Sequence, residues 1–386
     1  MTKKKILFLT GTRADFGKLK SLIKAVKDSA MEYCIFVTGM HTMNRYGYTV
    51  DEVNKAGFNN IHIFMNQIYG EPMDMVLANT INGLSRFIHE NRPDMIVVHG
   101  DRVEALAGAI VGSLNNIFVA HIEGGELSGT IDGLIRHSIS KLAHLHFVAN
   151  EEAAARLTQL GENPKSIYII GSPDIDIMLS STLPLIDEVK QYYDIVFEHY
   201  SIVMFHPVTT ELDKIHSDIS ELVDALIETK RNYVVIYPNN DEGCHDIFAG
   251  YERLRKLERV KMFPSLRFEY FLVLLKHADF IIGNSSAGIR EAPVYAVPSI
   301  DIGTRQNGRF DHNTINHVNP CKNEILKAIA ETRNLVHNKP QPCMYFGQGD
   351  SAQKFIAVLK SEELWKLSKQ KQFYELEKHI WKEKTM

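Results

Sequence analysis

Residues 95–102 read MIVVHGDR, and residues 117–126 read IFVAHIEGGE. Each stretch begins with a short apolar run, typical of a strand buried on both faces of a parallel sheet, and ends in charged residues and glycine. In an open α/β sheet, ligands lie outside the carboxyl ends of the strands. Asp101 and Glu123 follow the two strands directly, and Asp132 comes slightly later. The pattern therefore predicts proton chemistry on a substrate bound at this edge of a sheet.

The same alternation of apolar runs and helical patterns continues along all 386 residues, a length that fits two domains. Apolar runs predict strands at 6–9, 33–37, 95–98, 117–120 and 145–148, and then at 201–205, 233–237, 260–263, 280–282 and 299–302. Helical patterns lie between them, for example at 217–229, 268–277 and 287–295. Repeated β-α units imply parallel strands with right-handed crossovers. We therefore expect an α/β fold of two Rossmann-like, doubly wound domains facing each other across a cleft.

The alternation breaks at Gly171-Ser172-Pro173, and we interpret the polar stretch after it as a hinge. We expect an N-terminal domain at 1–175, which carries the carboxylates, and a C-terminal domain at 190–361. The chain ends in helical sequence, and we expect its last part, about 362–386, to return to the N-terminal domain.

The composition limits the class of protein. A hydrophobic content of 45%, a charged content of 23% and a net charge of −4 are typical of a soluble globular protein and argue against a nucleic-acid partner. The four cysteines are scattered, which favours thiols over zinc ligands or disulfides. No apolar run approaches the ~20 residues of a membrane span, and the run after the N-terminal lysines is too short for a signal peptide. We expect a cytoplasmic protein with no membrane partner.

A glycine-containing junction, GTRADFGK at residues 11–18, links the first strand to the first helix. Such a junction directs backbone N–H groups at an anion, and Arg13 and Lys18 add positive charge. A tight turn with an N-cap fits the same residues equally well. The spacing is neither G-x-G-x-x-G nor a Walker motif, so dinucleotide and ATP binding are weakly supported.

The matching junction of the second half is GNSSAGIRE at residues 283–291. Ser285 and Ser286 lie where a helix is expected to begin, so their hydroxyl and N–H groups can reach a phosphate. Glu291 is placed to accept hydrogen bonds from a ribose diol. The alternative is a serine N-cap followed by a surface glutamate.

Further candidates follow the other strands of the second half. His206 is a candidate phosphate ligand or general acid, although a lone histidine is more often structural. Asn239 can contact a ligand, the backbone around Phe263 can face a base, and Arg305 can bind a phosphate. We interpret the remaining conspicuous histidines as packing groups: His41, His121, His137 and His144.

In this order, the motifs resemble those of the UDP-N-acetylglucosamine 2-epimerase family, and specifically its hydrolysing branch. They are GTRADFGK, HGDR, HIEGGELSGTIDGLIRH, FHPVTT, YPNND, GNSSAGIREAP and IDIGTRQ, between residue 5 and about residue 310. HIEGGELSGT with its downstream aspartate is similar to the hydrolysing enzymes, where the others typically read HVEAG. The segments TGMH, NQIYGEPM and SSTLPLIDEVKQYY most resemble the bacterial enzymes that begin sialic acid synthesis for capsules.

The resemblance implies a glycosyltransferase-B-like fold, UDP in the cleft, and neither a metal nor a redox cofactor. The implied UDP contacts are Arg13, Arg102, His206, Asn239, Phe263, Ser285, Ser286, Glu291 and Arg305. The implied catalytic residues are Asp101, Glu123 and Asp132, with His206 as a further candidate. Because relatives pair through helices of the first domain, we also expect a homodimer or homotetramer.

The reaction that the resemblance implies cleaves the anomeric C1–O bond, so that UDP leaves and a base removes the C2 proton. Water then adds to the resulting 2-acetamidoglucal and gives N-acetylmannosamine. We assign Asp101 to the elimination and Glu123 and Asp132 to the hydration. The sequence leaves open the same chemistry on UDP-N,N'-diacetylbacillosamine, a non-hydrolysing epimerase, a glycosyltransferase of the same fold and an inactive nucleotide-sugar sensor.

Overall fold

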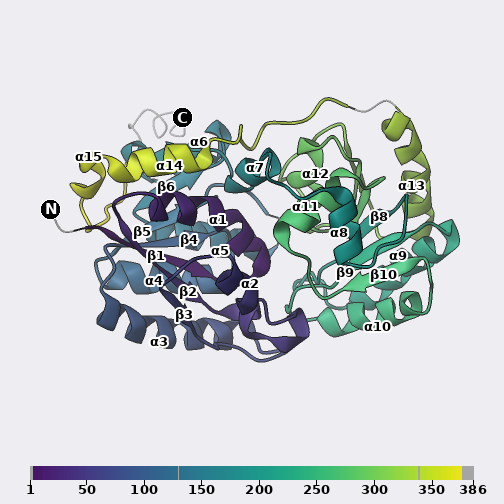
Figure 1. Ribbon diagram of the computed structural model, residues 1–386, viewed down its shortest axis with the longest axis horizontal. Coiled ribbons are helices and arrows are strands. Elements are labelled where there is room, and N and C mark those ends of the chain that lie inside the picture. The colour runs from purple at the N-terminus through teal and green to yellow at the C-terminus, as the bar shows by residue number, and fades with distance from the viewer. Residues whose placement is uncertain (1–2, 129, 338–339, 376–386) are drawn as a thin grey trace, which may run out of the picture.

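The computed structural model describes residues 3–128, 130–337 and 340–375, and these form two α/β domains (Figure 1). The first domain contains seven parallel strands in the order β3-β2-β1-β4-β5-β6-β7. They are β1 (Lys5–Thr10), β2 (Glu32–Val37), β3 (Ile61–Ile63), β4 (Met95–His99), β5 (Phe118–Ile122), β6 (Leu145–Val148) and β7 (Ile167–Ile169).

Helices cover both faces of this sheet, and the side chains of β1 point alternately to one face and to the other. Ile6 and Phe8 join one apolar cluster with α1 and α2, whereas Leu7 and Leu9 join another with α3, α4 and α5. The helices of this domain are α1 (Arg13–Lys27), α2 (Val50–Lys55), α3 (Met73–Asn91), α4 (Val103–Leu114), α5 (Ile131–Leu142) and α6 (Glu151–Gln159), with 3₁₀ turns η1 (Gly39–Thr42), η2 (Asn44–Tyr46) and η3 (Pro164–Ser166).

The second domain contains six parallel strands in the order β10-β9-β8-β11-β12-β13. They are β8 (Ser201–Met204), β9 (Tyr233–Ile236), β10 (Val260–Phe263), β11 (Ile281–Gly283), β12 (Ser299–Ile302) and β13 (Ile315–Val318). Its helices are α7 (Pro173–Met178), α8 (Ile186–Tyr192), α9 (Ile215–Thr229), α10 (Cys244–Arg255), α11 (Phe268–Lys276), α12 (Glu291–Val294) and α13 (Lys322–His337), with the 3₁₀ turn η4 (Ser286–Gly288). One face is covered by α9, α10 and α13, and the other by α8 and α11. The helix α7 lies at the domain boundary, where it packs on α1 and α14 as well as on α11.

Each strand predicted from an apolar run is present, within one or two residues at its ends. The sequence did not reveal β3, β7 and β13, all of which lie at a sheet edge. Edge strands are covered less than central ones, and IHI, IYI and INHV are short and partly exposed. They therefore lack the continuous apolar run that marked the central strands.

The prediction of a continuous helix at 287–295 is wrong. The chain forms η4 (Ser286–Gly288) and then the four-residue helix α12, which begins at Glu291. Pro293 has no N–H to donate to the carbonyl of Ile289, and its ring would collide with that carbonyl. Pro293 is therefore tolerated in the first turn of α12, but a helix that began at residue 287 could not continue through it.

The chain crosses between the domains twice, and the two crossings lie side by side. At the first crossing, Ser172 donates a backbone hydrogen bond of 2.6 Å to the carbonyl of Phe346 at the second. The return begins earlier than expected, because α14 (Ser351–Lys360) as well as α15 (Glu362–Trp365) packs on the first domain through Phe355, Leu359 and Leu364 (Figure 1). The helical sequence expected at 362–386 is helical only in part: α15 ends at Trp365, residues 366–375 form no helix, and residues 376–386 lie outside the described residues.

Across the residues with described positions, the structure contains no helix with the length and apolarity that crossing a membrane requires.

Candidate functional site

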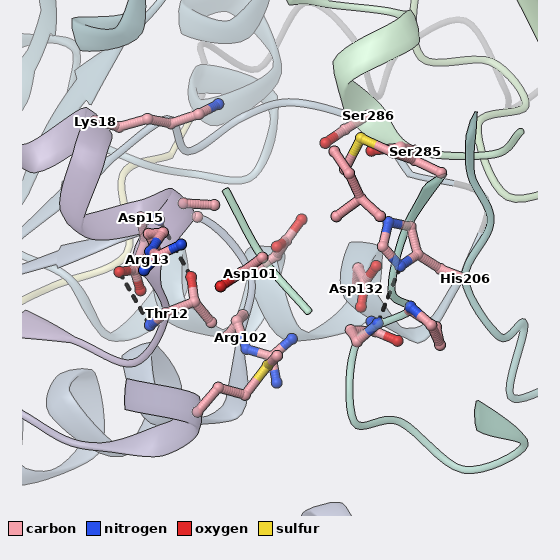
Figure 2. Close-up of a pocket in the computed structure, with 18 of the residues that line it drawn as sticks. Thr12, Arg13, Asp15, Lys18, Asp101, Arg102, Asp132, His206, Ser285 and Ser286 are labelled. Atoms are coloured by element: carbon pink, nitrogen blue, oxygen red, sulfur yellow. Dashed lines mark hydrogen bonds between the residues drawn. The ribbon is translucent and has the colours of Figure 1, made fainter. Parts of the chain in front are cut away.

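A cleft of ≈ 280 Å³ lies between the two domains, where the carboxyl ends of both sheets meet. Residues following β4 and β5 line one wall, and residues following β8, β9, β11 and β12 line the other. In Figure 2, Asp101, Asp132 and His206 surround the same open space. The cleft is lined by most of the predicted site residues, namely Arg13, Asp101, Arg102, Glu123, Asp132, His206, Asn239, Ser285, Ser286 and Arg305.

Asp101 and Asp132 have opposite pKa shifts although they share the cleft. Burial alone would raise the pKa of Asp101, but the hydrogen-bonded guanidinium of Arg136 outweighs burial and lowers it. Burial raises the pKa of Asp132, and the negative charge of Asp101 adds to the effect, against the opposing charge of Arg305 at 3.1 Å. One carboxylate therefore stays ionised while its neighbour binds a proton more readily, which is how acid and base roles are separated in enzymes.

Glu123 is held rigidly at the end of β5. Its φ of 62° lies in the left-handed region, its N–H donates to the carbonyl of Phe147 at 2.9 Å, and its carbonyl accepts from Arg136 at 3.1 Å. Such a conformation is costly for a residue other than glycine and is often found at functional sites.

The Glu123 carboxylate is paired on both oxygens. Oε1 accepts from Arg290 Nη2 at 2.8 Å and from the hydroxyl of Ser172, whereas Oε2 lies 3.1 Å from His99 Nε2 and 4.0 Å from Lys18 Nζ. Burial would raise the pKa of Glu123, but Arg290, followed by Lys18 and His99, holds it well below its usual range. Arg290 comes from the second domain, so this carboxylate is fixed by both halves of the chain.

His206 is oriented by two asparagines. Its Nδ1 accepts from the N–H of Asn239 at 3.1 Å, so in the neutral ring Nε2 carries the hydrogen. Asn284 accepts from the N–H of His206 at 2.7 Å and donates to its carbonyl at 2.8 Å, which fixes the backbone. Burial, together with the charges of Arg305 and Arg102, holds the pKa of His206 well below its usual range. His206 therefore presents a neutral hydrogen-bond donor.

Ser285 and Ser286 line the cleft at η4, not at the start of a long helix. Ser285 caps this turn by accepting from the N–H of Ala287 at 3.3 Å. Arg305 lies close by, since its Nη1 donates to the carbonyl of Asn284 at 3.2 Å. A guanidinium, two hydroxyls and a neutral imidazole thus gather on the second-domain wall, a donor set suited to a phosphate group.

Two predicted site residues do not line the cleft. Glu291 is buried and forms an ion pair of 3.2 Å with Lys18, so it is neither the surface residue of one interpretation nor turned towards the open space. Phe263 packs its ring against Tyr193, and its carbonyl accepts from the N–H of Tyr237 at 3.0 Å.

The junction at residues 11–18 contains an N-cap. Thr12 accepts from the N–H of Asp15, and Asp15 accepts from the N–H groups of Gly11 and Thr12, so these amides already have partners. Arg13 nevertheless lines the cleft, 3.7 Å from Glu52. Arg102 lies on the same wall and pairs with Glu104 at 3.3 Å. This junction therefore contributes a side-chain charge, and the amides of Gly11, Thr12 and Asp15 are not free to bind an anion.

Lys18, which was expected to add positive charge, lines the cleft, and so do residues that were given no role from the sequence, namely Asp15, His99 and Arg309. His99 carries a usable signal, because it is the last residue of β4 and stands two residues before Asp101. The histidines interpreted as packing groups include His121, which is fully buried and bonded to Ser140 and to the carbonyl of Gly100.

Two Rossmann-like domains that enclose a cleft at the carboxyl ends of their sheets define a glycosyltransferase-B-like fold. The profile of the UDP-N-acetylglucosamine 2-epimerase family matches residues 24–360, and the chain belongs to this family.

Relatives support this assignment. The chain is 51% identical to a UDP-N-acetylglucosamine 2-epimerase of Neisseria meningitidis serogroup B, over 97% of this chain and 99% of that protein. It is 31% identical to the UDP-N,N'-diacetylbacillosamine 2-epimerase (hydrolyzing) of Legionella pneumophila, over 93% and 96% of the two chains. The fold is similar to that of the Methanocaldococcus jannaschii UDP-GlcNAc 2-epimerase in complex with UDP-GlcNAc and UDP. That match has a TM-score of 0.79 at 20% identity and covers 92% of this chain and 99% of that one.

Proposed function

We propose that this protein is a hydrolysing UDP-N-acetylglucosamine 2-epimerase, which converts UDP-N-acetylglucosamine and water into N-acetylmannosamine and UDP. In bacteria that coat themselves with sialic acid, this reaction is the first step towards that sugar. The observation that carries the proposal is the division of the cleft between carboxylates with separated pKa values and a wall of phosphate-type donors.

The first half of the proposed reaction is elimination of UDP. As the C1–O bond breaks, positive charge grows at C1 and the C2 proton becomes acidic. Asp101 serves as the base for that proton, and its lowered pKa keeps it ionised for this task. The electron pair of the C1–O bond leaves with the diphosphate, and 2-acetamidoglucal remains.

The second-domain wall receives the departing diphosphate. His206 donates from Nε2, Arg305 supplies a positive charge, and Ser285 and Ser286 supply hydroxyl donors. Donors that are already oriented stabilise charge as it develops, without a cost of reorganisation at that moment.

The second half is hydration of the glucal. A proton must arrive at C2 on the face opposite to the first, while water attacks C1. Asp132 is the proposed donor of that proton, because its raised pKa favours the protonated form. Glu123 supports the attack of water on C1.

Incubation with UDP-N-acetylglucosamine alone, followed by proton NMR, tests the proposal. Free N-acetylmannosamine together with UDP is the expected outcome. Recovery of UDP-N-acetylmannosamine would instead identify a non-hydrolysing epimerase, and turnover only in the presence of a sugar acceptor would identify a glycosyltransferase.

A second candidate substrate is UDP-N,N'-diacetylbacillosamine. The 31% identical Legionella relative is named after this nucleotide sugar. The higher identity to the Neisseria relative favours the N-acetylglucosamine substrate. Comparison of kcat/KM for the two nucleotide sugars decides between them, and a higher value for the diacetyl sugar would overturn the preference.

A further inference from the structure

The proposed reaction requires a base near Glu123, but the Glu123 carboxylate is a poor one. Its Oε1 is occupied by Arg290 and Ser172, and its Oε2 faces His99 and Lys18. A proton on either oxygen would displace one of these partners. Glu123 is therefore better suited to orient another group.

His99 is the group that it orients. The register of β4 and β5 pairs His99 with Ile122, which places the ring beside the next residue, Glu123. His99 Nε2 lies 3.1 Å from Glu123 Oε2, and the ring lines the cleft. Nε2 has no hydrogen-bond partner of standard geometry among the described residues, and Glu123 Oε2 is the acceptor close to it. Because an ionised carboxylate only accepts hydrogen bonds, a turn of the ring that joins the two atoms requires the hydrogen on Nε2. The other nitrogen, Nδ1, is then left as a lone-pair acceptor.

We propose that His99 and Glu123 form a catalytic dyad in which His99 Nδ1 is the base for hydration and Glu123 positions the ring. This inference rests on the proposed function and assigns the base of its second half. A carboxylate that fixes the tautomer of an imidazole and stabilises the imidazolium is the arrangement found in serine hydrolase triads.

In the proposed step, water loses a proton to His99 Nδ1, and its oxygen forms a bond to C1 of the glucal. The π electrons of the C1=C2 bond take the proton of Asp132 and form the C2–H bond. Asp132 is left as a carboxylate and His99 as an imidazolium paired with Glu123, and exchange of protons with solvent restores both.

The test supplies synthetic 2-acetamidoglucal and UDP to the enzyme, so that hydration is measured without elimination. His99→Gln keeps a donor towards Glu123 but has no basic nitrogen, and Glu123→Gln removes the orienting charge. We expect each variant to lose hydration by about 10²–10⁴-fold and to retain UDP binding. The double variant should lose little more than either single variant, because the two residues act as a unit.

A second variant separates chemistry from folding. His99→Ala leaves space for free imidazole, which should restore part of the hydration rate in that variant and not in Glu123→Gln. Hydration at the wild-type rate by His99→Gln, additive losses in the double variant, or no rescue by imidazole would overturn the dyad. Absence of N-acetylmannosamine from UDP-N-acetylglucosamine with the wild-type enzyme would instead overturn the proposed function.

Discussion

The two walls of the cleft carry charge in different ways. On the first-domain wall, Asp101 is paired with Arg136, and Glu123 is paired with Arg290 across the domain boundary. On the second-domain wall, His206 is a neutral hydrogen-bond donor. Arg305 supplies a positive charge there, and Ser285 and Ser286 supply hydroxyl groups at the start of η4. Paired carboxylates with separated pKa values are suited to moving protons, whereas fixed donors are suited to holding an anion. We propose that the walls divide the work in this way, and variants of both walls test that division.

The largest effect should follow from Asp132→Asn on the first wall. The variant cannot deliver a proton, so turnover should fall by about 10²–10⁴-fold while UDP affinity stays close to the wild-type value. Steady-state kinetics and calorimetric titration with UDP measure the two quantities. Asp213→Asn, at an exposed position, is the matched control and should leave both unchanged. A wild-type turnover in Asp132→Asn would remove the residue from the proposed mechanism.

A smaller effect is expected on the second wall from Arg305→Met. Hydrogen bonds to charged groups contribute about 1.5–3 kcal/mol, so the Kd for UDP should rise by roughly 10–150-fold. Calorimetric titration measures the Kd, and Arg253→Met at the exposed pair with Asp224 is the control. If UDP affinity were unchanged, the wall would not be the diphosphate site.

The contact between the walls is probed by Gly17→Ala. A Cβ at Gly17 in α1 would come within 2.5 Å of the Phe268 side chain in α11 of the other domain. Overpacking costs about 1–3 kcal/mol, so kcat/KM should fall by about tenfold if the domains must meet closely. Adding Phe268→Gly, which removes the Cβ as well as the ring, should restore part of the loss, and purely additive effects in this double-mutant cycle would contradict the argument.

The smallest effect concerns stability against acid. Burial lowers the pKa of His41 and of His121 to about 3, so both are neutral in the folded state. The unfolded chain binds protons to them below about pH 6.5, and stability is therefore full above that pH and lost as the pH falls towards 3. Thermal unfolding between pH 7 and pH 4 measures the loss. His121→Gln should show a shallower pH dependence than the wild type, and His216→Gln, at an exposed site, should not.

Much of the fold was predictable because its signals are local. A buried parallel strand is a continuous apolar run, so β1, β4 and β5 could be placed from the sequence alone. The edge strand β3 could not, since an exposed edge requires no such run. Pro293 was a local signal that was not used, and it would have prevented the helix prediction at 287–295.

The site was predictable as a set of residues but not as a set of interactions. Strand ends locate Asp101, Glu123 and His206 at the cleft, because parallel sheets gather their carboxyl ends. No local signal predicts that Glu291 forms an ion pair with Lys18 and does not line the cleft.

The amino-acid sequence by itself determined two Rossmann-like domains and the family, because strand runs, glycine junctions and motifs are written in consecutive residues. Only the tertiary structure decided which carboxylate is paired with which cation. Glu123 meets Arg290 over a separation of 167 residues, and His99 meets Glu123 through the register of two strands. The pKa of a carboxylate depends on burial and on charges a few ångströms away, and those neighbours exist only once the domains have folded against each other.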